Sequence, residues 1–66
     1  MIKYVLYIWD NNLKKFCYSE QLKYQAKIIE GEHIRLRMKK YTVAKVEHDL
    51  DANVIDLYIY LEEDTA

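Results

Sequence analysis

The chain has 66 residues, a formal net charge of −1 and a single cysteine. This length allows one small domain, which buries only about 60% of its unfolded surface. One cysteine excludes an internal disulfide, and the sequence shows no cluster with metal-ligand spacing, so large side chains must stabilise the fold. Seven tyrosines, one tryptophan and one phenylalanine supply that bulk. They exceed what so small a core can bury, and exposed tyrosine is typical of interfaces.

Charge is sorted along the sequence. Residues 1–46 carry all ten bases and four acids, a net +6, whereas residues 47–66 carry seven acids and no base, a net −7. Such asymmetry is compatible with an electrostatic partner. The favoured alternative is self-neutralisation, in which the charges of the chain compensate one another within the fold. An acidic last strand that pairs with basic strands would bring opposite charges together.

The first predicted element is a strand over residues 2–9, which is apolar on both faces. Such a strand lies in the middle of a sheet or is partly covered by a partner. Asp10-Asn11-Asn12 predicts a turn, because Asn and Asp tolerate positive φ. Residues 2–9 and 13–18 should therefore form an N-terminal hairpin.

We expect no targeting signal at the start of the chain. Its apolar run lacks a small-residue cleavage site and is too short to span a bilayer. Met1 followed directly by a strand leads us to expect a complete small open reading frame. The lone Cys17 fits a reducing setting, so we expect a cytoplasmic protein with no membrane segment.

Residues 19–30 allow two interpretations. A helix would be capped by Ser19 and followed by Gly31 at its C-terminal end. The alternative is an extended connector that leads into a strand near Glu32. We expect a short helical turn over residues 19–26 and extended chain from residue 27.

Alternating segments fill the rest of the chain and predict strands over residues 28–38, 41–48 and 54–62, with turns at Lys39-Lys40 and 49–53. The apolar register slips between Val43 and Val46, which predicts a β-bulge near Ala44-Lys45. Sharp bends of this kind close small sheets into barrels. The predicted core consists of Ile2, Tyr4, Leu6, Ile8, Phe16, Ile34, Leu36, Val43, Val46, Ile55, Leu57, Ile59 and Leu61.

The second half of the chain resembles a known kind of barrel. The resemblance rests on Glu30-Gly31-Glu32-x-Ile34-x-Leu36, then Tyr41-x-Val43-x-x-Val46-x-His48-Asp49, then a closing Ile-Asp-Leu-Tyr-Ile-Tyr-Leu-Glu strand. These strings are similar to small SH3-like barrel proteins of the type encoded by phages and other mobile elements. The resemblance covers residues 28–62 and carries over no binding residues. The turn at Lys39-Lys40 lacks the glycine that such barrels often use there.

Pattern and resemblance together predict an all-β fold. We expect residues 1–66 to form one domain, a five-stranded antiparallel SH3-like barrel or strongly curled sheet.

Reactive side chains are few. Cys17, His33 and His48 have neither the spacing of a zinc site nor the orienting partners of a nucleophile. Asp49-x-Asp51-x-Asn53 matches the start of an EF-hand loop, but Val54 stands at its sixth position and Tyr60 at its twelfth. We therefore expect a hairpin turn there, and no catalytic, cofactor or metal site.

The predicted binding residues are Arg35 and Arg37 of the third strand, Tyr58 and Tyr60 of the last strand, and Trp9. Arg, Tyr and Trp are enriched at protein interfaces and their hot spots. The same residues offer phosphate contacts and stacking to single-stranded nucleic acid. Asp56 and Glu62 lie on the face of the two tyrosines and would repel phosphates.

The sequence thus predicts a non-catalytic protein–protein interaction module. The alternative is a single-stranded nucleic-acid binder that uses the same Arg/Tyr surface. A homodimer formed through the first strand stays open.

Overall fold

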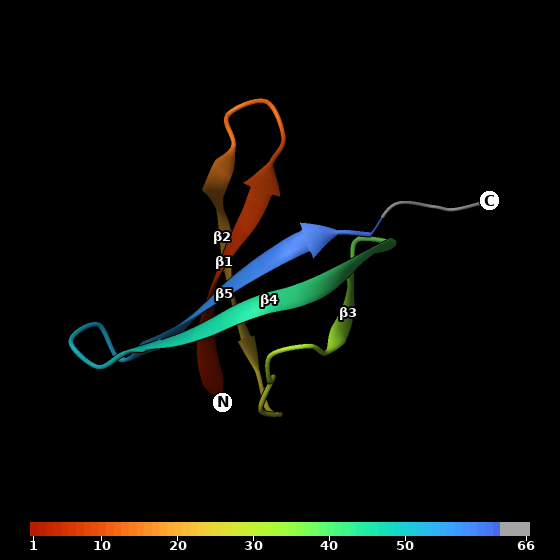
Figure 1. Ribbon diagram of the computed structural model, residues 1–66. Coiled ribbons are helices and arrows are strands. Elements are labelled where there is room, and N and C mark those ends of the chain that lie inside the picture. Colours follow the sequence, from red (N-terminus) through yellow and green to blue (C-terminus); the bar gives the residue numbers. More distant parts are fainter. Residues whose placement is uncertain (63–66) are drawn as a thin grey trace.

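The computed structural model describes residues 1–62, and five strands make up one sheet (Figure 1). The strand order is β2-β1-β5-β4-β3. β1 and β5 are parallel, and the other three pairs are antiparallel. The strands are β1 (Ile2–Asp10), β2 (Lys15–Tyr24), β3 (His33–Leu36), β4 (Lys39–Asp49) and β5 (Val54–Leu61).

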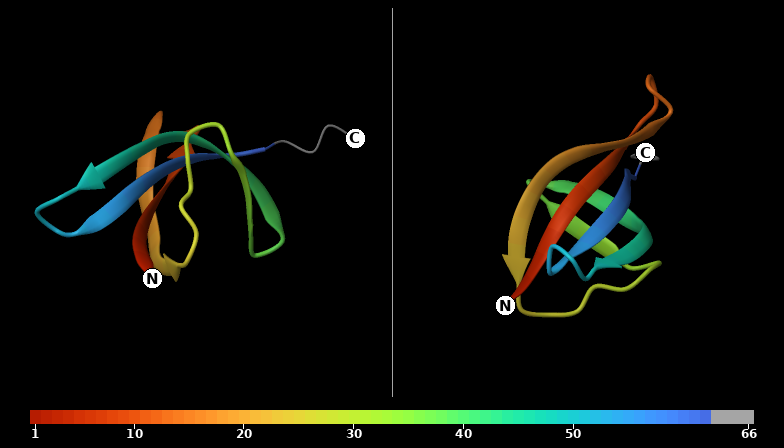
Figure 2. Two further views of the ribbon diagram at one scale, coloured as in Figure 1. Left: turned by 90° about the horizontal axis from the view of Figure 1, so that it is seen from below. Right: turned by 90° about the vertical axis from the view of Figure 1, so that its left-hand side faces the viewer.

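The sheet curls into a half-barrel with β2 and β3 at its edges (Figure 2). The expected all-β, five-stranded, curled architecture is confirmed, but the expectation of a fully antiparallel sheet is wrong. The reason is topological: five strands that alternate in direction place the first and fifth in the same direction. When these two strands pair, they must be parallel.

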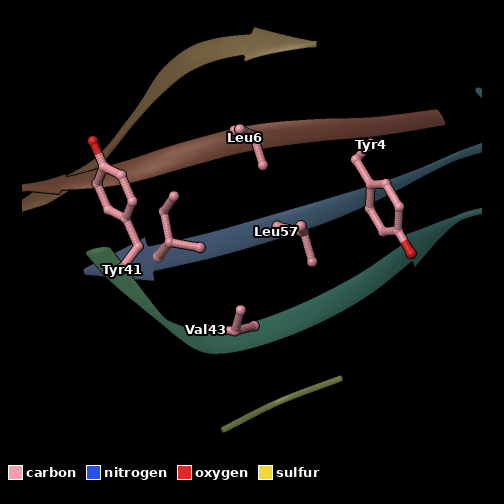
Figure 3. Packing of buried hydrophobic residues seen from close by; sticks show 6 residues of the cluster. Tyr4, Leu6, Tyr41, Val43 and Leu57 are labelled. Carbon is pink, nitrogen blue, oxygen red and sulfur yellow. The ribbon is translucent and has the colours of Figure 1, made fainter. Parts of the chain in front are cut away.

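The core lies on the concave face of the sheet (Figure 3). Its buried side chains are Tyr4, Leu6, Tyr41, Val43, Leu57 and Ile59. Most of the predicted core is confirmed, since Ile2, Ile8, Ile34, Leu36, Val46 and Ile55 pack against this cluster.

Two residues of the predicted core lie elsewhere. The prediction also omits four residues that are buried or pack against the core, namely Val5, Leu22, Ile28 and Tyr41. Phe16 lies opposite Trp9 on the other face of the sheet, and Leu61 is 49% exposed at the end of β5. Tyr41 was omitted but is buried, because the alternation that turns Val43 inward also turns Tyr41 inward.

Two of the three predicted turns are confirmed. The Asp10 carboxylate accepts hydrogen bonds from the amides of Asn12 and Leu13 at 2.8 and 3.0 Å. Asp49 accepts one from the Ala52 amide at 3.0 Å, in the turn before β5. Short Asp side chains stabilise turns in this way.

The third turn lies two residues earlier than predicted. Lys39 and Lys40 belong to β4, and the turn consists of Arg37 and Met38 with φ of 51° and 66°. Positive φ at both central residues is typical of a two-residue hairpin turn that matches the strand twist. Neither glycine nor asparagine, the residues that favour positive φ, stands at this turn.

The predicted helical turn over residues 19–26 is wrong. Those residues continue β2 as far as Tyr24, opposite Ile2 of β1. A ladder along the whole of β1 satisfies more backbone groups than one isolated helical turn would. The connector over residues 25–32 then leads to β3, which begins at His33 rather than at residue 28.

The β-bulge predicted near Ala44-Lys45 is confirmed. Val43 lies opposite Ile59 and Lys45 opposite Tyr58, which leaves Ala44 as the extra residue of β4. A second bulge interrupts the β1–β2 ladder at Leu6/Tyr7, where Ser19 is the extra residue of β2. Each bulge changes which side chains of its strand face the core.

Candidate functional site

Six aromatic rings lie on the sheet face opposite the core, and we call this cluster the aromatic face. β1 creates it, because the alternation that turns Leu6 and Ile8 inward turns Tyr7 and Trp9 outward. Side chains from the two strands beside β1 complete the cluster. Its members are Tyr7, Trp9, Phe16, Tyr18, Tyr58 and Tyr60.

The two bulges bring the neighbouring strands into line with this face. The bulge at Ser19 sets Tyr18 beside the outward Tyr7 and Glu20 beside the inward Leu6. A regular strand would have pointed Tyr18 and Glu20 to the same side. The bulge of β4 likewise sets Lys45 beside Tyr58.

One row of the face runs across four strands from β4 to β2. The Lys45 ammonium lies 5.3 Å from the centroid of the Tyr58 ring. The Tyr58 ring stacks on the Tyr7 ring at 5.0 Å and 14°, and Tyr7 meets Tyr18 edge-on at 6.2 Å. The row is therefore a continuous ladder of one cation and three rings.

The second row contains the single tryptophan. Trp9 meets Phe16 at 5.1 Å and Tyr60 at 5.7 Å between ring centroids. Phe16 also contacts Tyr58 at 5.2 Å, which joins the two rows into one cluster. The Trp9 indole nitrogen donates a hydrogen bond to the Asn11 side chain at 3.0 Å.

Part of this cluster faces solvent. Tyr18 is 60% exposed and Tyr60 is 41% exposed, whereas Tyr7, Trp9, Phe16 and Tyr58 are partly buried. Edge-on and offset ring pairs contribute about 0.5–1.5 kcal/mol each beyond their buried area, so the cluster also stabilises the sheet. Rings that are held rigidly and still exposed lose little entropy when a partner covers them.

An acidic margin borders the rings on the side of the β4–β5 hairpin, and we define it as Glu47, Asp49 and Asp56. Glu47 lies opposite Asp56 in the ladder, one row away from Tyr58. Asp56 is only 9% exposed, and no hydrogen bond or ion pair of its carboxylate occurs within residues 1–62.

Burial and the negative charge of this margin together raise the pKa values of three acidic groups in and beside it. Burial, and then the charges of Asp49 and Glu47, raise the pKa of Asp56. Burial raises the pKa of Tyr7 and of Tyr58, and the margin carboxylates raise both further. A cation placed here would relieve the repulsion among these groups.

Lys45 is the base that pairs with a carboxylate of the margin. Its ammonium lies 3.1 Å from the Glu47 carboxylate, and this hydrogen bond raises the pKa of Lys45. The side chain is 60% exposed, so solvent weakens the pair. Lys45 thus occupies a position between a tyrosine ring and a carboxylate.

The structure brings together three of the five predicted binding residues, namely Trp9, Tyr58 and Tyr60. The two arginines lie elsewhere. Arg37 leaves the β3–β4 turn and forms an ion pair with Glu20 of β2. Arg35 lines a groove of about 400 Å³ between β3 and the end of β2.

Sequence reasoning missed Tyr7, Phe16, Tyr18 and Lys45. Tyr7 carried a signal, because it shares a face with Trp9 by simple alternation. Phe16 and Tyr18 alternate in the same way, but the first was assigned to the core. Lys45 was hidden by the bulge, whose position sets the outward register of β4.

Two further findings concern residues 1–62. No group of three or more His, Cys, Asp or Glu side chains in this range is placed to hold a metal ion. The described chain also contains no helix long and apolar enough to cross a membrane.

Comparison with known proteins finds no matching family model, curated protein sequence or solved structure.

Proposed function

We propose that this chain is a non-catalytic protein–protein interaction module whose partner covers the aromatic face. The observation that carries the proposal is a rigid six-ring cluster on the sheet surface opposite the core. Aromatic side chains are enriched in the centres of protein interfaces and at hot spots. The outer part of the cluster, Tyr18 and Tyr60, is accessible for such contact.

We also propose a fold family and a cellular setting for this chain. We assign the half-barrel to the SH3-like type that the sequence resembles, and we infer a cytoplasmic phage or mobile-element product that modulates a host or phage protein. The free Cys17 suits that reducing setting.

Single-stranded nucleic acid is the second candidate, because bases stack on exposed aromatic rings. The acidic margin argues against it, since three carboxylates adjoin the rings and the nearest base, Lys45, is paired with Glu47. Arg35 and Arg37 are not part of the aromatic face, so they add no positive charge to it. Dedicated nucleic-acid binders place a positive patch beside their stacking rings.

Photo-crosslinking from the aromatic face tests the proposal. A photoreactive phenylalanine analogue replaces Tyr18 in one variant and Tyr24 in the other, and each variant is irradiated in lysate of the organism that carries the gene. Both tyrosines are exposed residues of β2, but Tyr24 lies outside the aromatic face. We expect a discrete protein adduct from position 18 that is absent from position 24. Identical adducts from both positions, or none from position 18, would contradict the proposal.

Oligonucleotide binding tests the second candidate, a single-stranded nucleic-acid binder. Anisotropy of a labelled 20-nucleotide oligothymidine is measured at 20 and 200 mM salt. Phosphate-driven binding would appear at low salt and fall by at least about tenfold at the higher concentration. We expect no binding at either concentration.

A further inference from the structure

The Lys45 side chain marks a cation site on the aromatic face. Its ammonium lies 5.3 Å from the Tyr58 ring centroid and 3.1 Å from the Glu47 carboxylate. An ammonium or guanidinium gains from both contacts, because the ring face and the carboxylate are both negative. The chain therefore fills this site with a cation of its own.

That one lysine does not neutralise the acidic margin. Within residues 1–62, Glu47 is the one margin carboxylate that forms an ion pair, and Asp56, which is 9% exposed, has neither an ion pair nor a side-chain hydrogen bond. Burying an unpaired carboxylate costs free energy that a second cation would recover. The two observations, a cation over a ring and an unpartnered buried acid beside it, are independent of each other.

We propose that the partner of the aromatic face presents a lysine or arginine side chain, which docks beside Tyr58 against the acidic margin and displaces Lys45. This inference rests on the proposed function and names the chemistry of the partner. The occupant is a basic segment of a protein, because the site combines stacked rings with carboxylates. An acidic segment would meet the repulsion of the same three carboxylates.

Displacement of Lys45 is easy on physical grounds. The Lys45 side chain is 60% exposed and Glu47 is 51% exposed, so their pair is screened by water. A partner that covers Tyr18 and Tyr60 would exclude that water and strengthen its own cation–π and charge contacts. Arginine suits the site best, because its planar guanidinium stacks on a ring while donating to a carboxylate.

Hexa-arginine is the test probe and hexaglutamate is the control, in calorimetric titrations at 150 mM salt. We expect hexa-arginine to bind and hexaglutamate not to bind. Tyr58→Leu keeps an apolar side chain but removes the ring, and it should weaken hexa-arginine binding about three- to tenfold. Tyr24→Leu removes a ring outside the aromatic face and should leave binding unchanged. Circular dichroism confirms that each variant is folded.

Lys45→Gln gives the decisive comparison. This change vacates the site and leaves the margin without its base, so hexa-arginine should bind at least about threefold more tightly. Lys27→Gln makes the same change in net charge on the connector, outside the aromatic face. Its effect should stay below about twofold at this salt concentration.

Equal tightening by both glutamine variants would overturn the proposal, because bulk charge alone would then explain binding. Weaker binding to Lys45→Gln than to wild type would overturn it as well. Neither result affects the crosslink from position 18, which tests whether a partner covers the aromatic face at all. Failure of cation recognition is thus distinguishable from failure of the proposed function.

Discussion

Tyr4 joins the core to the long connector over residues 25–32. Its ring is fully buried, while its hydroxyl donates a hydrogen bond to the Ala26 carbonyl at 2.9 Å. The same oxygen accepts one from the Ile28 amide at 3.0 Å. One hydroxyl thus satisfies two backbone groups near the start of the connector, whereas Gly31 and Glu32 at its end form backbone hydrogen bonds with Val43 of β4.

Replacing Tyr4 by Phe removes both hydrogen bonds and keeps the buried ring. We expect the free energy of unfolding to fall by about 1–3 kcal/mol, because two partly buried backbone groups lose their partner. Urea denaturation measures the change. Tyr41→Phe is the matched control, since Tyr41 is also buried but its hydroxyl forms no hydrogen bond within residues 1–62. A loss as large in Tyr41→Phe would contradict this account.

Asp56 carries an acidic group at a position where its charge lowers stability. The residue is 9% exposed and lies beside like charges, and its pKa is raised above the ordinary 3.8. The folded state therefore binds a proton more readily than the unfolded state does, so the ionised group lowers stability at neutral pH.

Asp56→Asn should raise the free energy of unfolding at pH 7 by about 1 kcal/mol, since a neutral amide is cheaper to bury than a carboxylate. As pH falls through the raised pKa, the wild-type group is protonated and the advantage of the variant shrinks. Below the unfolded-state pKa of 3.8 the advantage should be gone. Thermal melts at pH 7 and pH 3 measure it, with the exposed Asp51→Asn as control. A gain that is equal at both pH values would show that its cause is not ionisation.

At the scale of elements, turns and bulges decide what each strand displays. The β3–β4 turn places Arg37 and Met38 at positive φ, a conformation that costs a residue with a side chain about 1–2 kcal/mol. The bulge at Ala44 in turn directs Lys45 outward to Tyr58. The turn therefore sets the pairing of β3 with β4, and the bulge sets the register that places Lys45 beside the aromatic face.

Met38→Gly should stabilise the protein by about 0.5–1 kcal/mol, because glycine adopts positive φ without strain. Met38 is 96% exposed, so the change removes no packing. Leu50→Gly is the control in the β4–β5 turn, where the residue is 87% exposed and φ is negative. That variant should be neutral or slightly less stable. The midpoint of urea denaturation reports both, and destabilisation by Met38→Gly would disprove the turn assignment.

For the whole molecule, the important feature is the seam between the edge strands β2 and β3. Closure of the barrel would require these two strands to pair, but a groove of about 400 Å³ separates β3 from the end of β2. Arg37 and Glu20 bridge the two sides with an ion pair. One oxygen of Glu20 is buried without a hydrogen-bond partner, so the pair holds a carboxylate that is largely removed from water.

Arg37→Ala should lower the free energy of unfolding by about 1 kcal/mol, because it leaves that carboxylate unpaired. The exposed guanidinium limits the effect, since solvent screens it. Arg35→Ala serves as control, because Arg35 has no ion pair within residues 1–62 and should have an effect below about 0.5 kcal/mol. Urea denaturation at low salt measures the free energy of unfolding of both variants. If the two variants lose the same stability, the ion pair does not hold the seam.

The arrangement of the strands explains part of the charge asymmetry of the sequence. β4 begins with Lys39 and Lys40 and ends with Glu47 and Asp49, so the sorting along the chain also runs along one strand. The acidic β5 lies between β1 and β4, but Asp56 faces Glu47 rather than a base. Self-neutralisation is therefore incomplete at the acidic margin.

The sequence by itself determined the strands, two turns, the bulge of β4 and most of the core. These features follow from local alternation and from the hydrogen-bonding habits of Asp and Asn, which need no distant partner. Trp9, Tyr58 and Tyr60 were also recognisable as surface residues on the same grounds. The predicted helical turn over residues 19–26 is wrong. Local capping preferences stabilise a helical turn less than the hydrogen bonds to β1 stabilise a strand, and those bonds form only when β1 lies alongside.

Only the tertiary structure decided the rest. The parallel β1–β5 pair, the six-ring cluster and the pairing of Arg37 with Glu20 all join segments far apart in sequence. Their formation depends on the direction and register of distant strands, and the extra residue Ser19 shifts that register without leaving a local pattern. The surplus of aromatic residues predicts an interface. The bulge of β2 turns Tyr18 toward the aromatic face, and the bulge of β4 places Lys45 beside it.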